Sequence, residues 1–146
     1  MSIPADFRRV LEAGDPDWSK GVSPRFYLLY GDHLKNTLHG YTVSEFQKVM
    51  AQISAMARGS KEKRILSRLI IGQSICIEVD KDGRTVMPIR QREKLGLEEG
   101  ELKFSGLGEY FEIWKSEIYE QDVSGEVNEW LDQQGEDFDP LVMIKG

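Results

Sequence analysis

The clearest hydrophobic pattern in the chain lies between residues 42 and 56, where apolar residues recur every three or four positions. This spacing predicts an amphipathic helix with one buried face. Thr42 and Glu45 have the spacing of a capping box, in which the Thr42 hydroxyl accepts a hydrogen bond from the Glu45 backbone N–H. Gly59 is placed to end the helix. The apolar positions are Val43, Phe46, Val49, Met50, Ile53 and Met56.

Aromatic-rich and alternating segments predict strands before and after this helix. Residues 26–30 and 38–41 form one expected pair, and residues 102–105 and 110–114 form an expected hairpin. Residues 75–79 alternate in the pattern of a half-buried strand. The strands and helices together predict an α+β domain.

Four more helices are expected, over residues 4–11, over residues 61–69, in a short segment after Pro88 that carries Arg92, and over residues 116–133. In the second of these, Ile65, Leu66 and Leu69 are predicted to face inward and the basic residues outward. The last one is predicted to present its apolar residues on one side, namely Ile118, Tyr119, Val123, Val127, Trp130 and Leu131.

One supersecondary unit occurs twice along the chain. A shift of 84 residues aligns Pro4 with Pro88, Arg8 with Arg92 and Leu11 with Leu95, and the segments 38–41 and 111–114 both precede a predicted helix. Such self-similarity is typical of a domain with an internal pseudo-two-fold axis. We therefore expect two related units that share one core, in a small interleaved β-barrel.

The net charge of −6 is concentrated at the C-terminal end. Seven acidic residues and only one basic residue, Lys145, lie beyond residue 120, whereas residues 1–120 carry equal numbers of acidic and basic side chains. An acidic total argues against a nucleic-acid partner, but this distribution leaves room for local basic surfaces. Two such clusters are Arg58, Lys61, Lys63, Arg64 and Arg68, and Lys81, Arg84, Arg90, Arg92 and Lys94.

Several classes of protein are not supported by the sequence. No apolar run approaches the length of a membrane span, and the single cysteine, Cys76, fits a reducing cytoplasm and a structural role. His33 and His39 lack the spacing of a metal site, and Gly106-x-Gly108 lacks the third glycine of a nucleotide loop. We therefore expect neither an enzyme nor a bound cofactor, metal or small-molecule substrate.

The segment from Asp80 to Arg84 carries the most distinctive chemistry. Gly83 suits a tight turn because it adopts positive φ without a Cβ clash. Asp80 is expected to hold the Arg84 guanidinium in a bidentate pair, and an arginine fixed in this way can contact guanine in a major groove. From spacing alone, a purely structural ion pair that locks the turn is the favoured interpretation.

Other basic residues are candidates for contacts with phosphates, which position a protein on DNA without specifying sequence. Lys81, Arg90, Arg92 and Lys94 flank the turn in the second unit. Arg8 is the first-unit counterpart of Arg92, and a solvated helix face explains it as well as DNA does. The cluster between residues 58 and 68 is interpreted as a solvated helix face.

The repeated pattern resembles the MraZ family of the AbrB-like (SpoVT-AbrB) superfamily. The residues that carry the resemblance are Asp80, Gly83, Arg84, Pro88, Arg92, Leu95, Gly96, Leu97 and the segment Phe111-Glu112-Ile113-Trp114. It implies a double AbrB-like, swapped-hairpin β-barrel with flanking helices, and a DNA-binding transcriptional regulator whose Asp-x-x-x-Arg arginine, here Arg84, contacts double-stranded DNA. It further implies a homo-oligomeric ring that binds tandem repeats upstream of division and cell-wall genes, in the cytoplasm and nucleoid.

The expected organisation is a first AbrB-like repeat (1–58), a basic connecting helix (59–72), a second repeat (73–121) and an acidic C-terminal helix and tail (122–146). Counterparts of Asp80 and Arg84 would fall before Met1, so the first repeat is expected to be incomplete at its N-terminus. The alternative hypothesis is an AbrB-like, antitoxin-like interaction module without DNA binding, to which the acidic tail would contribute.

Overall fold

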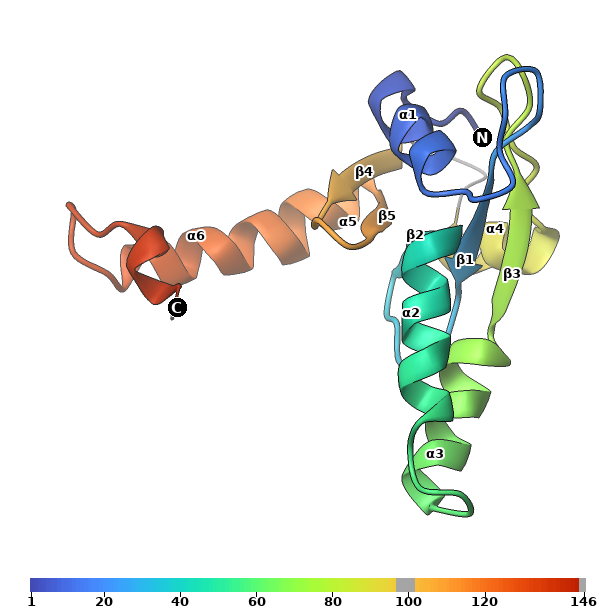
Figure 1. The fold of residues 1–146 in the computed structure, drawn as a ribbon. Coiled ribbons are helices and arrows are strands. Elements are labelled where there is room, and N and C mark those ends of the chain that lie inside the picture. The colour runs from blue at the N-terminus through green and yellow to red at the C-terminus, as the bar shows by residue number, and fades with distance from the viewer. Residues whose placement is uncertain (97–101, 145–146) are drawn as a thin grey trace.

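The computed structural model describes residues 1–96 and 102–144, and Figure 1 shows their arrangement. The strands are β1 (Arg25–Leu29), β2 (Thr37–Thr42), β3 (Ser74–Glu78), β4 (Leu102–Gly106) and β5 (Phe111–Lys115). The helices are α1 (Ala5–Ala13), α2 (Val43–Ser54), α3 (Lys61–Leu66), α4 (Ile89–Leu95), α5 (Ser116–Ile118) and α6 (Gly125–Asp132). Helical turns of other types are η1 (Ser67–Ile71), η2 (Tyr119–Ser124) and η3 (Pro140–Met143).

The strands form one antiparallel sheet in the order β3-β1-β2-β5-β4, which confirms the predicted α+β class. Two hairpins, β1–β2 and β4–β5, meet where Leu38 lies opposite Ile113. The outer strand β3 comes from the second half of the chain but pairs with β1 of the first half, so that Ile77 lies opposite Phe26. The two halves therefore share one sheet.

The hydrophobic core contains equivalent positions from both sequence repeats. Leu11 of α1 and Leu95 of α4 are both buried, and they join Phe26, Ile77 and Ile113 from the sheet in one cluster. Complete burial of such side chains stabilises the fold by roughly 1.5–3 kcal/mol each. Because the repeat places an apolar residue at the same point of each short helix, both helices pack against a common core.

Helix α2 packs against the side chains on the other face of β1 and β2. The ring of Phe46 stacks on Tyr27 at 4.4 Å between centroids and contacts Tyr41 edge-on. The Thr42 hydroxyl accepts a hydrogen bond from the Glu45 backbone N–H at 3.1 Å, which confirms the predicted helix start. Alternation along β1 thus places Phe26 in the main core and Tyr27 under α2.

The first residues of the chain pair with the Asp80–Arg84 segment. Ser2 forms an antiparallel bridge with Arg84, and the Ile3 backbone N–H donates to the Gly83 carbonyl at 2.7 Å. The Thr85 N–H donates to the Met1 carbonyl at 2.8 Å. Met1 and Thr85 are 84 residues apart and therefore occupy equivalent repeat positions. The pairing therefore joins equivalent positions of the two sequence repeats.

One prediction about an individual side chain is wrong. Ile65 is predicted to face inward, but it is 45% exposed on α3. The connecting helix itself is present as α3 and η1 and ends at Gly72. The final helix is also present, with α5, η2 and α6 running without a break from Ser116 to Asp132. Leu97 lies outside the described residues.

Candidate nucleic-acid interface

The Asp80–Arg84 segment forms a tight, hydrogen-bonded turn after β3. The Asp80 N–H donates to the Arg84 carbonyl at 2.8 Å, and the Gly83 N–H donates to the Asp80 carbonyl at 3.0 Å. Gly83 has a φ of +77°, as predicted from the need for glycine at this point. The buried Thr85 hydroxyl donates to the Glu78 carbonyl at 2.8 Å, which ties the outgoing chain to the end of β3.

The predicted bidentate pair between Asp80 and Arg84 is not formed. One Asp80 carboxylate oxygen instead accepts hydrogen bonds from the backbone N–H groups of Asp82, at 2.9 Å, and Arg84, at 2.8 Å. The Asp80 side chain is short, and the turn already points nearby backbone N–H groups at its carboxylate. The carboxylate therefore accepts hydrogen bonds from these N–H groups instead of from the longer Arg84 side chain. Asp80 therefore orients the backbone that carries Arg84, and the Arg84 side chain is exposed.

Arg8 lies directly against this turn. Its Nη1 atom is only 2.7 Å from the point that a Cβ on Gly83 would occupy, and the Arg8 side chain is partly buried. The short helix α1 thus carries its arginine to the turn of the other sequence repeat. The sequence suggested Arg8 as a candidate but gave no indication of this contact.

We expect Gly83→Ala to lower the free energy of unfolding by about 1–3 kcal/mol, because the new Cβ is strained at positive φ and displaces Arg8. Urea denaturation measures this loss. Gly59→Ala is the matched control, since Gly59 has a φ of +79° and no atom lies within 4 Å of its Cβ position. Equal losses in the two variants would show that the contact between Arg8 and the turn contributes nothing.

Further basic residues gather beside the turn, around a hollow of about 360 Å³. Lys81 lines it together with Arg8 and Arg9 from α1, and Lys20 joins them from the loop between α1 and β1. Lys20 was not among the residues predicted from the sequence to contact DNA. No local pattern marks Lys20, because its proximity to Lys81 depends on how two distant loops pack side by side (Figure 1).

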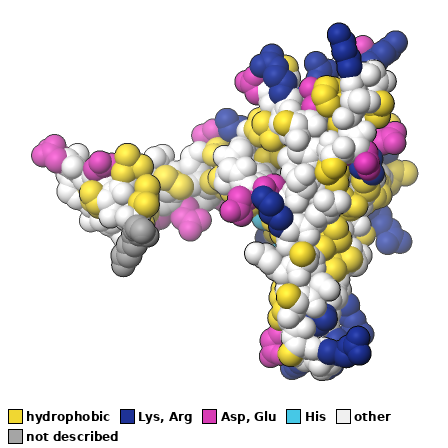
Figure 2. Space-filling model, in the orientation of Figure 1, with side chains coloured by type: hydrophobic (Ala, Val, Ile, Leu, Met, Phe, Trp, Pro, Cys, Tyr) yellow, Lys and Arg dark blue, Asp and Glu magenta, His cyan; other side chains and the backbone are white. Residues whose placement is uncertain are grey.

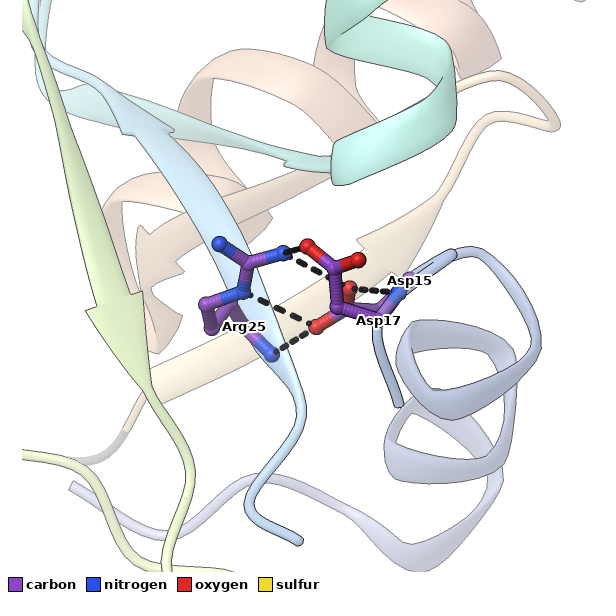
Figure 3. Close-up of polar contacts among 3 residues, drawn as sticks. All are labelled: Asp15, Asp17 and Arg25. Atoms are coloured by element: carbon purple, nitrogen blue, oxygen red, sulfur yellow. Dashed lines mark hydrogen bonds and ion pairs between the residues drawn. The ribbon is translucent and has the colours of Figure 1, made fainter. Parts of the chain in front are cut away.

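An ion-pair network anchors the loop that carries Lys20 (Figure 3). Asp15, which is 5% exposed, accepts hydrogen bonds from the Arg25 backbone N–H, Nε and Nη2 at 2.9–3.2 Å. Arg25 also bonds the exposed Asp17 carboxylate at 2.9 Å. The hydrogen bonds from the Arg25 side chain lower the pKa of Asp15, and those same bonds raise the pKa of Arg25. The network fixes the loop to the start of β1.

The remaining predicted basic residues lie on α4. Arg90 and Arg92 are exposed there, outside the residues that line the hollow. The Lys94 ammonium donates to the carbonyls of Tyr30 and Gly31 at 3.0 and 2.8 Å, and burial lowers the pKa of Lys94. Lys94 therefore has a structural role, and we do not include it in the candidate interface.

Charge is distributed unevenly over the molecule. Figure 2 shows Lys and Arg side chains gathered at the top, near the turn and α1, and again at the foot, near α3. Acidic and hydrophobic side chains line the projecting C-terminal arm. Within residues 1–96 and 102–144, no helix has the length and apolar character of a membrane span, and no cluster of three or more His, Cys, Asp or Glu could hold a metal ion.

An exposed arginine on a rigid turn can donate two parallel hydrogen bonds to an acceptor pair, and neighbouring lysines and arginines can contact phosphates. Comparison with known proteins agrees with a binding role. A scan against models of protein families finds no match. The chain is 44% identical over all 146 of its residues to the "Transcriptional regulator MraZ" of Ruegeria pomeroyi, of which it covers 87%.

Two further relatives carry the same description. The chain is 41% identical over 132 residues to the protein of Cereibacter sphaeroides, with 86% of this chain and 77% of the relative aligned. It is 32% identical over 137 residues to that of Thermoanaerobacter pseudethanolicus, with 90% and 86% aligned. These relatives define the class as transcriptional regulators, a non-enzymatic role. The chain belongs to the MraZ family.

Proposed function

We propose that this regulator binds double-stranded DNA in a sequence-specific manner through the surface around the Asp80–Arg84 turn. The observation that carries the proposal is the exposed Arg84, whose backbone N–H donates to the Asp80 carboxylate and whose carbonyl accepts from the Asp80 N–H. A guanidinium on a fixed backbone is suited to guanine O6 and N7 in the major groove. The proposed phosphate contacts are Arg8, Arg9, Lys20, Lys81, Arg90 and Arg92.

The proposed fold is the double AbrB-like, swapped-hairpin barrel that the resemblance implies. The pairing of β3 with β1 supports it, because a strand of one half completes the sheet of the other. The bridge between Ser2 and Arg84 supports it in the same way. The division of the chain into two repeats, a connecting helix and a tail, with boundaries after residues 58, 72 and 121, stays a prediction within this proposal.

The proposed target is the set of tandem repeats upstream of division and cell-wall genes, and the proposed assembly is a homo-oligomeric ring in the cytoplasm and nucleoid. Both are implied by the resemblance. A ring suits tandem repeats because several subunits bind one DNA together. Such multivalency raises the overall affinity by roughly 10²–10⁴-fold over a single contact.

We test DNA binding by fluorescence-anisotropy titration of a tandem-repeat duplex and a shuffled duplex of equal length. Since phosphate contacts release counterions, about six such contacts predict an affinity loss of roughly 1,000-fold between about 50 and 200 mM salt. The tandem repeat is expected to bind more tightly than the shuffled duplex at both concentrations. Equal affinity for the two duplexes would contradict sequence-specific binding.

The second candidate is an AbrB-like, antitoxin-like interaction module that does not bind DNA. The projecting acidic helix α6 favours it, because an acidic arm with exposed apolar residues suits a protein partner (Figure 1). A folded protein without measurable affinity for either duplex at low salt would support this candidate over the first.

A further inference from the structure

The C-terminal arm, residues 116–144, extends away from the sheet and leaves an apolar stripe uncovered (Figure 1). Val127, Trp130 and Leu131 are 52%, 37% and 39% exposed on α6. Their spacing places them on one face of the helix together with Val123. The segment after α6 adds the exposed residues Leu141, Val142, Met143 and Ile144. Several uncovered apolar side chains on one arm mark a contact surface.

The arm is also strongly acidic. Residues 120–144 contain eight carboxylates and no Lys or Arg, and the exposed Glu126 and Glu129 both lie on the Trp130 side of the apolar stripe on α6. A partner of the arm must therefore combine positive charge with exposed apolar surface. Like charges would repel any acidic partner.

The foot of the same chain, formed by α3 and η1, combines positive charge with exposed apolar side chains. Helix α3 and η1 carry Lys61 and Arg68 on the face of the exposed Ile65, since the three residues are spaced four and three apart. Ile71 adds a second apolar side chain that is 41% exposed. Within the described part of the chain, no basic residue of this helix pair forms an ion pair with a carboxylate.

The arm and the foot of one molecule point in different directions in Figure 1. The continuous helix from Ser116 to Asp132 is about 25 Å long, at 1.5 Å a residue, and it carries its acidic face away from the body. The foot also lies at the opposite end of the molecule from the Asp80–Arg84 turn, so the proposed DNA surface does not occupy it.

We propose that the arm of one copy docks on the foot of a second copy. Val127 and Trp130 cover Ile65, and Glu126 and Glu129, on the Trp130 side of the apolar stripe, pair with Lys61 and Arg68. The contact is heterologous, because each copy offers two different surfaces. Repetition of such a contact closes into a ring when the rotation between copies permits it. The inference rests on the proposed self-association and names the surfaces that produce it.

Charge reversal tests the contact in the full chain by light scattering after size-exclusion chromatography. The arm variant Glu126→Lys/Glu129→Lys and the foot variant Lys61→Glu/Arg68→Glu are each expected to reduce the mass to that of the monomer, because like charges then face each other. A chain with all four substitutions is expected to regain the assembled mass. An equimolar mixture of the two variants is also expected to assemble.

Two control variants test whether a change in net charge by itself abolishes assembly. Asn128→Lys adds a positive charge on the side of α6 opposite Glu126, and Glu62→Lys makes the foot more basic. Both are expected to keep the wild-type mass. Circular dichroism establishes that each variant is folded. Lys61 and Arg68 are substituted in place of Lys63 and Arg64, because Lys63 and Arg64 donate hydrogen bonds to backbone carbonyls of the same region and their replacement would remove these bonds.

A monomeric wild-type protein, or an arm variant that keeps the wild-type mass, would overturn the inference. The inference would also be overturned if the arm variant and the foot variant each lose assembly but the chain with all four substitutions does not regain it. DNA affinity is measured separately with the Arg84→Ala variant. A wild-type protein that binds the tandem-repeat duplex but is monomeric would therefore refute the docking contact alone. A wild-type protein that assembles but does not bind DNA would refute the proposed function alone.

Discussion

Replacing Arg84 with alanine is expected to weaken binding to a tandem-repeat duplex by about 10- to 100-fold for each engaged subunit. A bidentate arginine–guanine contact contributes roughly 1–3 kcal/mol of discrimination, and truncation at Cβ removes it entirely. Because several copies of an oligomer act on one DNA, the loss multiplies across the subunits that bind. Fluorescence anisotropy at constant salt measures the effect on the tandem repeat and on a shuffled duplex.

Two comparisons separate base recognition from charge. Lys81→Ala is expected to weaken binding to both duplexes by a similar factor and to reduce the salt dependence by about one phosphate contact. Lys48→Ala removes a cation on α2, where Lys48 pairs with Glu45, and is expected to leave binding unchanged. An Arg84→Ala variant that keeps the full preference for the tandem repeat would refute direct readout by Arg84.

The Arg84→Ala variant is also expected to remain folded. The Asp80–Arg84 turn is held by backbone groups and by the Asp80 carboxylate, and its hydrogen bonds do not involve the Arg84 guanidinium. Exposed side chains of this kind change stability by about 0.5 kcal/mol or less. An unchanged melting temperature beside a lost affinity would assign the effect to the interface.

Replacing Asp15 with alanine is expected to have the largest effect on stability, a loss of about 2–4 kcal/mol. The Asp15 side chain is 1% exposed and accepts three hydrogen bonds from Arg25 and one from the Asp17 N–H. Removal of the carboxylate leaves these donors without their partner, and breaking a buried ion pair costs several kcal/mol. Urea denaturation at neutral pH measures the loss.

Asp17→Ala is the matched control for this prediction. Asp17 binds the same Arg25 guanidinium at the same distance of 2.9 Å, but its side chain is 82% exposed. A solvent-exposed ion pair contributes about 1 kcal/mol or less. Equal losses from Asp15→Ala and Asp17→Ala would show that burial of Asp15 does not determine the strength of the network.

The contribution of Asp15 is expected to depend on pH in the acidic range. The hydrogen bonds from Arg25 lower the pKa of Asp15 in the folded state below its ordinary value of 3.8. The folded state therefore holds the proton less tightly than the unfolded state. This stability is fully present above the unfolded pKa and is lost as the pH falls through the folded pKa. The stability difference between wild type and Asp15→Asn should narrow over that range.

The sequence by itself determined the local structure and the family. The Thr42 cap, the glycine turn at Gly83 and the two hairpins depend on residues within a few positions of one another, and the structure confirms all three. The 84-residue repeat aligned Leu11 with Leu95, and both lie in the core. The resemblance to the MraZ family is confirmed by relatives with up to 44% identity.

Only the tertiary structure decided contacts between residues distant in the chain. The sequence indicated that Asp80 acts in the turn, but its actual partners are backbone N–H groups, because side-chain direction depends on the turn geometry. The pairing of β3 with β1 and the position of Lys20 beside Lys81 result from the packing of whole elements. The exposure of Ile65 has the same cause: periodicity identifies an apolar position, whereas its burial requires a neighbouring element to cover it.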